Sequence, residues 1–331
     1  MKTNDLKEIL SAEECQPPTL MKLVGVGGCG RRIVERRFFW EPHLSIVIDD
    51  DPQLLEPETV DDNPQSYSCG GPVERNYIEK DDPALHEKLQ AIVGDNVHML
   101  IIVTGLGREY SAPIVSALCR QRRLAGNGVT LVFAVYPFLF ERKGKKAEAD
   151  LAMIEKEATK VFLRHNGDLR WYNEDAVTDY KIRVENSINF AIDSINEMIS
   201  RNWFSYVDYN DIVALLQSGD KAEYIHCWGS GRCRVHKAVK SLIESIKWAE
   251  KKYGPLKSIF LGIPISNISE SDEYKIIIKK QKTIVQALYD YFGDDIWILC
   301  KVYLSYNERV DKDDLKITAL TTYSSNRQAN E

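Results

Sequence analysis

The first stretch with residue types suited to phosphate chemistry is a glycine-rich turn near the N-terminus. It occurs in KLVGVGGCGRRIVERRF with GxGxxG spacing, and its candidate ligand-binding residues are Gly25, Gly27, Gly28, Cys29, Gly30 and Arg31. An apolar strand over 23–26 precedes the turn, and a helix-like stretch follows from Arg31. Glycines let the backbone approach a phosphate closely, and a helix N-terminus supplies free N–H groups. A strand, turn and helix in this order predict a phosphate-binding loop.

A second glycine-containing loop, TGLGREYSAPIV, follows an apolar strand expected over 99–103. Its candidate ligand-binding residues are Gly105, Gly107, Arg108 and Ser111. Ser111 is also the expected N-cap of a helix that starts near Pro113. Ligands of a parallel, doubly wound sheet bind at the carboxyl ends of its strands, so both glycine loops are expected at one site.

Two carboxylates, Asp208 and Asp211, lie in a loop that follows a predicted amphipathic helix over 184–202. The helix has an apolar stripe at helical spacing. Its other face, expected to meet solvent or a ligand, carries Glu185, Asn189, Asp193 and Glu197. On pattern alone, a core helix with a solvated loop is the simpler interpretation, with the two acids as caps or surface charge.

The glycine turn also has other interpretations. It could be a plain tight turn, with Cys29 filling space and Arg31 solvated together with Arg32. A strand over 44–48 ends in Asp49, and an acid at the end of the second strand fits the ribose of NAD. An NAD-dependent oxidoreductase is therefore a rival hypothesis.

The expected elements define an α/β fold class with two units. In the first unit, further elements are helices over 84–93 and 147–164 and a strand over 129–135, whereas residues 52–83 are polar and turn-rich. Alternating strands and helices favour a parallel sheet. The second unit is expected to be α+β, with strands over 258–264, 296–305 and 315–323 and a helix over 279–292.

Composition narrows the class of protein. With 331 residues, 44% of them hydrophobic and 28% charged, the chain has the make-up of a globular protein of two packed units. The sequence contains no run of about 18 apolar residues, so no membrane-spanning segment is expected. The start lacks a secretory signal, and seven scattered cysteines form no disulfide framework, so a cytoplasmic location is expected. A net charge of −6 gives no attraction to nucleic acid, and no metal site is expected.

Several segments together resemble the FtsZ/tubulin superfamily, and FtsZ more than eukaryotic tubulin. GVGGCGRRIV is similar to the first glycine loop of that family, VTGLGREYSAPIV to its signature loop, and VYPFLFERKGKK to its VTKPFxFEGKK segment. SRNWFSYVDYNDI is similar to the loop after the central helix, CWGSGRCRVHKAV to GxGSAxGxxRAxxA, and DLKITALTTY to the last strand. The matched segments occur in the family's order from residue 21 to residue 323.

The resemblance implies a Rossmann-like GTPase domain over 21–183, a central helix over 184–202 and a smaller α+β domain over 203–323. An N-terminal extension over 1–20 and a short tail over 324–331 complete the division. It implies GTP or GDP as ligand, with Mg²⁺ accompanying the nucleotide. In this family Glu141 would help to hold the ribose and Asn186 would lie at the base, and Pro137 would also belong to the nucleotide-binding site. Monomers would stack head to tail, and Asp208 and Asp211 would position water on the next subunit's nucleotide.

Departures from the family pattern concern the phosphate loops and the base. Arg108, Glu109 and Tyr110 follow Gly107 where the family has GGGTG and a small residue, and the loop is about three residues shorter. Asn186 replaces a guanine-reading Asp, and Ile182 replaces an aromatic residue. The chain ends soon after its last strand, so the long linker and C-terminal peptide of FtsZ are expected to be missing.

The sequence therefore predicts an FtsZ-like cytoskeletal protein that binds GTP, self-assembles head to tail and hydrolyses GTP weakly at subunit contacts. The alternative is a catalytically inactive scaffold that acts in membrane remodelling or cell division with a membrane-associated partner. Neither nucleic acid nor direct membrane insertion is expected. The NAD-dependent oxidoreductase is the remote alternative.

Overall fold

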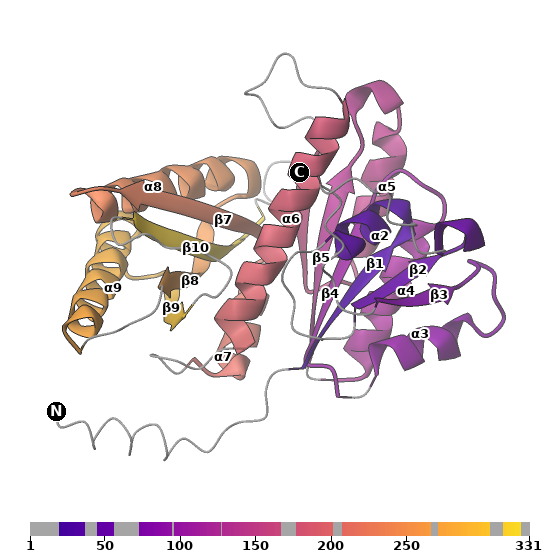
Figure 1. Ribbon diagram of the computed structural model, residues 1–331, viewed down its shortest axis with the longest axis horizontal. Helices are drawn as coiled ribbons and strands as arrows, with labels where there is room; N and C mark the ends of the chain where they lie inside the picture. The colour runs from indigo at the N-terminus through magenta and orange to yellow at the C-terminus, as the bar shows by residue number, and fades with distance from the viewer. Residues whose placement is uncertain are drawn as a thin grey trace, which may run out of the picture.

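The computed structural model describes residues 20–36, 45–55, 73–94, 96–126, 128–166, 177–200, 207–265, 271–304 and 314–325. Two sheets lie on opposite sides of one long helix, α6 (Val177–Ser200), which runs diagonally between them (Figure 1). The expected N-terminal extension lies outside the described residues except for residue 20, and so does most of the expected tail.

The first sheet is parallel and has six strands in the order β3-β2-β1-β4-β5-β6. Its strands are β1 (Met21–Val26), β2 (Ser45–Asp49), β3 (Val73–Tyr77), β4 (Met99–Gly105), β5 (Val129–Tyr136) and β6 (Lys160–His165). Its helices are α2 (Gly27–Glu35), α3 (Leu85–Val93), α4 (Ser111–Leu124) and α5 (Gly144–Glu155), with short 3₁₀ turns η1 (Pro52–Leu55) and η2 (Leu139–Glu141). The order reverses at β1, which pairs with β2 on one side and β4 on the other. Ligand sites of such sheets lie at this reversal.

Two strands of the first sheet differ from the sequence prediction. Strand β3 occupies part of the stretch expected to be turn-rich, and as a partly exposed strand at the sheet edge it lacks an apolar signature. The helix expected over 147–164 ends at Glu155, and β6 follows it. Phe162 of β6 is fully buried and stacks on Phe133 with ring centroids 5.0 Å apart, a contact that the strand's position at the sheet edge makes possible.

The apolar stripe of α6 is buried as predicted, and it joins the two sheets through one core. Ile188, Ile192 and Ile195 belong to the same buried cluster as Phe133 of the first sheet and Tyr303 of the second. The helix begins at Val177, earlier than the predicted residue 184. The polar face of α6 does not meet solvent as one of the two expectations had it, because three of its members are buried: Glu185, Asn189 and Glu197. Of these, Glu185 lines the cavity described below.

The second sheet has four strands in the order β7-β10-β8-β9. These are β7 (Lys221–Ser230), β8 (Leu256–Ile265), β9 (Trp297–Leu304) and β10 (Asp314–Tyr323), with helices α7 (Tyr209–Gln217), α8 (Arg234–Tyr253) and α9 (Ser271–Phe292). Strand β10 pairs antiparallel with β7 and β8, and β8 pairs parallel with β9. At Gly262 the sheet comes so close to α6 that an added Cβ would lie 2.7 Å from Cγ of Met198.

Within the described part of the chain, no helix is both long enough and apolar enough to cross a bilayer.

The close packing of α2 on the first sheet generates a stability prediction. A Cβ at Gly30 would lie 2.2 Å from the carbonyl oxygen of Val103 in β4. We therefore expect Gly30→Ala to lower the free energy of unfolding by about 1–3 kcal/mol, because α2 must move away from the sheet. Gly144→Ala is the control, since its Cβ would meet nothing closer than 3.5 Å. Chemical denaturation of both variants checks this, and equal stabilities would contradict it.

Candidate functional site

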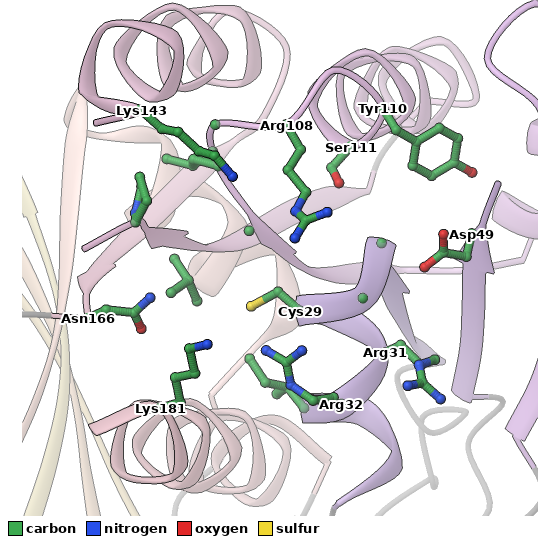
Figure 2. A pocket seen from close by; sticks show the side chains of 18 of the residues that line it. Cys29, Arg31, Arg32, Asp49, Arg108, Tyr110, Ser111, Lys143, Asn166 and Lys181 are labelled. Atoms are coloured by element: carbon green, nitrogen blue, oxygen red, sulfur yellow. The ribbon is translucent and has the colours of Figure 1, made fainter. Parts of the chain in front are cut away.

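A cavity of about 690 Å³ opens where the first sheet reverses its order, at the carboxyl ends of β1, β2, β4 and β5. The start of α2, the loop between β4 and α4, the segment after β5 and the first turns of α6 form its walls (Figure 2). Both predicted glycine loops meet here, as expected from the topology.

The first glycine loop divides into residues that face the cavity and residues that pack. Helix α2 begins at Gly27, not near Arg31, so Gly27, Gly28 and Cys29 form its first turn and line the cavity. The φ angle of Gly27 is 71°, and an added Cβ would lie 2.5 Å from Oγ of Ser111. Gly25 and Gly30 do not line the cavity. They allow α2 to lie against the sheet, since a Cβ at Gly25 would be 2.6 Å from the carbonyl oxygen of Gly30.

The second glycine loop lines the cavity with all four of its predicted residues: Gly105, Gly107, Arg108 and Ser111. Ser111 is the first residue of α4 and forms no side-chain cap, so its predicted N-cap role was wrong. The N–H of Gly107 donates a hydrogen bond to Oδ2 of Asp150 at 2.8 Å, and Asp150 is fully buried. The backbone N–H of Gly107 is therefore already bonded to a carboxylate of the protein and is not available to a phosphate.

Three of the cationic groups near the cavity are paired within the protein. Arg31 is 7% exposed and lies 3.3 Å from Glu35. Glu185, buried on α6, accepts hydrogen bonds from Arg32 at 3.1 Å and from Arg36 at 2.9 Å. The interpretation of Arg31 and Arg32 as solvated side chains was therefore wrong. The two pairs with Glu185 join α2 to α6, and all three arginines have carboxylate partners without a ligand.

Two other cations, Arg108 and Lys181, have no hydrogen-bond or ion-pair partner among the residues that the structure describes. Arg108 comes from the loop before α4 and Lys181 from α6, and both extend toward the space around Cys29 from opposite walls (Figure 2). Sequence reasoning missed Lys181 because the helix was expected to begin three residues later. Extending the helical pattern back toward Val177 would have included Lys181.

Cys29 lies between these cations at the start of α2, with its Cβ against Gly105. Loss of hydration raises the pKa of its thiol to about 11, although Arg32, Lys181 and Arg108 oppose that shift. A thiol with this pKa stays protonated at neutral pH, which agrees with the interpretation of Cys29 as a space-filling residue.

Carboxylates line the opposite end of the cavity, after β2. Asp49 is 3% exposed and accepts hydrogen bonds from the backbone N–H groups of Asp50 and Asp51. Burial raises the pKa of its carboxyl group, and Oδ2 has no hydrogen-bond partner in the described chain. No group of three or more His, Cys, Asp or Glu side chains among the described residues is arranged to hold a metal ion alone.

The segment after β5 contributes Pro137 and Glu141, both predicted, and Lys143, which was not. Glu141 accepts a hydrogen bond from the N–H of Phe138 at 3.2 Å, so its position is set by its own turn. Asn166, just after β6, also lines the cavity. It was missed because β6 was predicted as part of a helix, which hid the end of a sixth strand.

Besides Gly25 and Gly30, three predicted residues do not line the cavity: Asn186, Asp208 and Asp211. Asn186 is exposed on α6, whereas its neighbour Glu185 lines the cavity. Asp208 caps α7 by accepting a hydrogen bond from the N–H of Asn210 at 2.9 Å, and Asp211 is exposed in the first turn. Tyr209 donates to the carbonyl of His98, just before β4, so this acidic segment lies at the amino ends of the strands. The cavity is at their carboxyl ends.

Comparison with known proteins gives a consistent picture. No family model matches the chain. The cell division protein FtsZ of Porphyromonas gingivalis is 22% identical over 242 residues, and FtsZ of Aquifex aeolicus is 25% identical over 226 residues. The matches cover 69% and 62% of this chain but only 52% and 59% of those proteins, so the chain spans little more than half of their length.

Solved structures share the fold over nearly the whole chain. An FtsZ dimer from M. jannaschii has a TM-score of 0.72 at 15% identity and covers 97% of this chain and 92% of its own. CetZ2 of Haloferax volcanii, a GTPγS-bound protofilament, has a TM-score of 0.63 at 13% identity with 93% coverage of both chains. TubZ of Bacillus thuringiensis serovar israelensis, in GDP-form protofilaments, has a TM-score of 0.64 at 13% identity and covers 97% and 92%.

The fold, a Rossmann-like parallel sheet joined by a central helix to a second sheet, is that of cytoskeletal proteins of the FtsZ and tubulin type. Together with the sequence matches to two FtsZ proteins, the shared fold supports an FtsZ/tubulin superfamily member. None of these relatives is an oxidoreductase.

The environment of Cys29 predicts its reactivity. With a pKa of about 11, about one thiol in a thousand is ionised at pH 8. We expect iodoacetamide to modify the exposed Cys233 well before Cys29 at this pH, and the rate at Cys29 to rise roughly tenfold per pH unit up to about pH 10. Peptide mass spectrometry over time measures both rates. Equal rates at pH 8 would contradict the raised pKa of the Cys29 thiol.

Proposed function

We propose that the protein binds GTP or GDP in the cavity and assembles head to tail into filaments, with weak hydrolysis completed at subunit contacts. The observation that carries this proposal is a pair of cations, Arg108 and Lys181, that extend toward the start of α2 from opposite walls and have no ion-pair or hydrogen-bond partner among the described residues. Two free cations at a helix N-terminus form an environment suited to a polyphosphate. The CetZ2 structure, a GTPγS-bound protofilament, and the TubZ structure, in GDP-form protofilaments, support the same ligand class and assembly.

In this proposal the phosphates meet charged side chains more than backbone amides. Gly27 and Gly28 keep the first turn of α2 open, and Ser111 presents its hydroxyl beside them. The second loop offers fewer amides, because the N–H of Gly107 is bonded to Asp150. Arg108 and Lys181 would supply the charge that a longer glycine loop supplies with amides.

The other end of the nucleotide would lie toward Glu141 and Asn166. Glu141 can accept a hydrogen bond from a ribose hydroxyl, and Asn166 offers both a donor and an acceptor to a base. Asn186 does not line the cavity, so base reading through that residue is not part of the proposal. Mg²⁺ would be held mainly by phosphate oxygens and water, and Asp50 and Asp51, which line the cavity, are candidate carboxylate ligands.

Hydrolysis would require two subunits, because the acids and the cavity are at opposite ends of the first sheet. Asp208 and Asp211 of one subunit would orient the attacking water at the nucleotide of the next. Such a contact does not close on itself, so it extends into a filament. The domain division over 21–183, 184–202 and 203–323 belongs to the same proposal.

A second candidate is a scaffold that keeps the filament but has lost turnover, acting in membrane remodelling or division with a partner. The hydrogen bond from Gly107 to Asp150 favours it, since this bond removes a donor from the phosphate-binding loop. Asp208 also has a purely structural use as the cap of α7.

The ligand proposal predicts the effect of removing each free cation. Arg108→Gln and Lys181→Gln should each weaken binding of a slowly hydrolysed GTP analogue by about tenfold, because each removes one charge-assisted hydrogen bond. Lys156→Gln, an exposed site that does not line the cavity, is the matched control. Isothermal titration measures the affinities, with ATP and NAD analogues alongside. Wild-type affinity in both cavity variants would contradict this phosphate-binding role, and preferential binding of NAD would contradict the proposed function.

Asp211→Ala separates the GTPase from the inactive scaffold. In a GTPase, the variant should still bind nucleotide, because Asp211 does not line the cavity, and should release phosphate at least about a hundredfold more slowly. Phosphate release above the critical concentration measures this, with Asn210→Ala as a neighbouring control. Filaments that form normally in both variants without any phosphate release would favour the scaffold.

A further inference from the structure

We infer that the exposed face of α8 binds the anionic surface of a lipid membrane. This face, here called the basic stripe, contains five lysines: Lys237, Lys240, Lys247, Lys251 and Lys252. The inference is independent of the nucleotide site and of filament assembly, because no residue of the stripe lines the cavity or belongs to α7.

The lysines of the basic stripe follow one side of the helix. From Lys237 to Lys251 the exposed charged residues are spaced by three and four positions in turn, which aligns them over about 21 Å of an α-helix. The only acid among the exposed residues of α8 is Glu244. Five lysines and one glutamate give this face a net charge of +4, whereas the whole chain has a net charge of −6.

The fold does not account for this concentration of charge. Among the described residues, Lys240 alone of the five has a carboxylate partner, Glu244 at 4.0 Å, and the two side chains are 67% and 66% exposed. The helix dipole favours Lys251 and Lys252 in the last turn, but it disfavours Lys237 in the first turn, which has no acid. Lysines three or four residues apart on a helix also repel each other. An anionic partner would relieve this repulsion.

Two exposed aromatic rings accompany the lysines. Trp248 of α8 is 55% exposed and Tyr291 of α9 is 49% exposed. The ammonium group of Lys252 lies 5.3 Å from the ring centroid of Trp248, and that of Lys247 lies 5.3 Å from the ring centroid of Tyr291. Tryptophan and tyrosine combine an apolar ring with a polar group, which suits them to the boundary between lipid headgroups and acyl chains.

The basic stripe is on the side of the second sheet that faces away from α6. Tyr224 of β7 belongs to the buried cluster that contains Ile188 of α6, whereas the next residue, Ile225, belongs to the cluster that contains Leu242 of α8. Because successive side chains of a strand point to opposite faces, α6 and α8 cover opposite faces of this sheet (Figure 1). The apolar side of α8 is buried on the sheet, so its charged side is directed outward, where a broad surface can approach it.

The side chains favour a membrane over a nucleic acid or an acidic protein as the anionic partner. All five cations are lysines, whose strongly hydrated charges on flexible stems suit a fluid layer of headgroups, whereas bidentate recognition of individual phosphates or carboxylates relies on arginine. Clusters of about four to eight cations on an amphipathic helix are typical of contact with anionic lipids. Because the apolar side of α8 is packed on the sheet, this contact stays in the headgroup layer and inserts no segment across the bilayer.

The experiment is sedimentation of the nucleotide-free full chain with vesicles of phosphatidylcholine and phosphatidylglycerol, with pure phosphatidylcholine vesicles alongside. We expect binding to the anionic vesicles alone and release as the salt concentration rises. The double variant K247Q/K251Q should bind more weakly by about fivefold per lysine removed. K145Q/K156Q is the matched control: it changes the net charge equally at two exposed sites outside the stripe and should bind as wild type.

Two further variants separate loss of charge from loss of structure. K247R/K251R keeps both charges and should bind as wild type, and Trp248→Ala should weaken binding severalfold while the salt dependence remains. Thermal unfolding of each variant shows whether it is folded. Failure of wild type to bind the anionic vesicles, equal binding to neutral vesicles, or wild-type affinity in K247Q/K251Q would each overturn the inference. If wild type instead bound labelled double-stranded DNA at the same salt concentration and not the vesicles, the stripe would be a nucleic-acid site. Nucleotide affinity and polymer are measured separately, so none of these results bears on the proposed function.

Discussion

At Gly25 and Gly30, helix α2 lies so close to strands β1 and β4 that no Cβ atom fits between them. Gly25 and Gly30 contact each other's backbone, and Gly30 approaches the carbonyl oxygen of Val103. This contact places the first turn of α2 directly against the start of α4, where Gly27 leaves room only for the hydroxyl of Ser111. The cavity exists because these glycines keep two helix N-termini together at one end of the sheet. The position of the cavity depends on the lack of a Cβ atom at Gly25, Gly27 and Gly30. The same three positions allow the positive dipole ends of α2 and α4 to meet there.

The same packing determines how the charges around the cavity are used. Because α2 is fixed on the sheet, its arginines reach α6, where Glu185 accepts hydrogen bonds from Arg32 and Arg36. A buried carboxylate with two guanidinium partners joins the two elements at a small net charge. Arg108 and Lys181 stand outside this network. Within the part of the chain that the structure describes, some cations around the cavity are therefore paired and hold the fold, whereas Arg108 and Lys181 are available for a ligand.

Much of the fold could be predicted from sequence, because apolar strands such as β1, β4 and β5 alternate with helical patterns and a glycine turn shows where β1 ends. Strands β3 and β6 were missed since edge strands carry charged residues, and that error hid Asn166. Tertiary contacts explain the rest. Sequence periodicity cannot show that Glu185 is buried against two arginines from another helix, or that Asp150 reaches back to the N–H of Gly107. Lys181 was missed because helix ends are weakly encoded.

Helix α6 connects the two ends of the molecule through one continuous core. Its first turns carry Lys181 and Glu185 at the cavity, and its apolar stripe packs on both sheets. Beyond its last described turn the chain continues to α7, whose start is attached to the amino end of β4 through Tyr209 and His98. If a change in the cavity moved α6, it would also disturb the packing of α6 against the second sheet. The contact there is tight, because the side chain of Met198 lies directly against the backbone of Gly262. Tightly packed cores move as units, so a displacement of α6 is expected to shift the elements packed on it and not only the residues near the cavity.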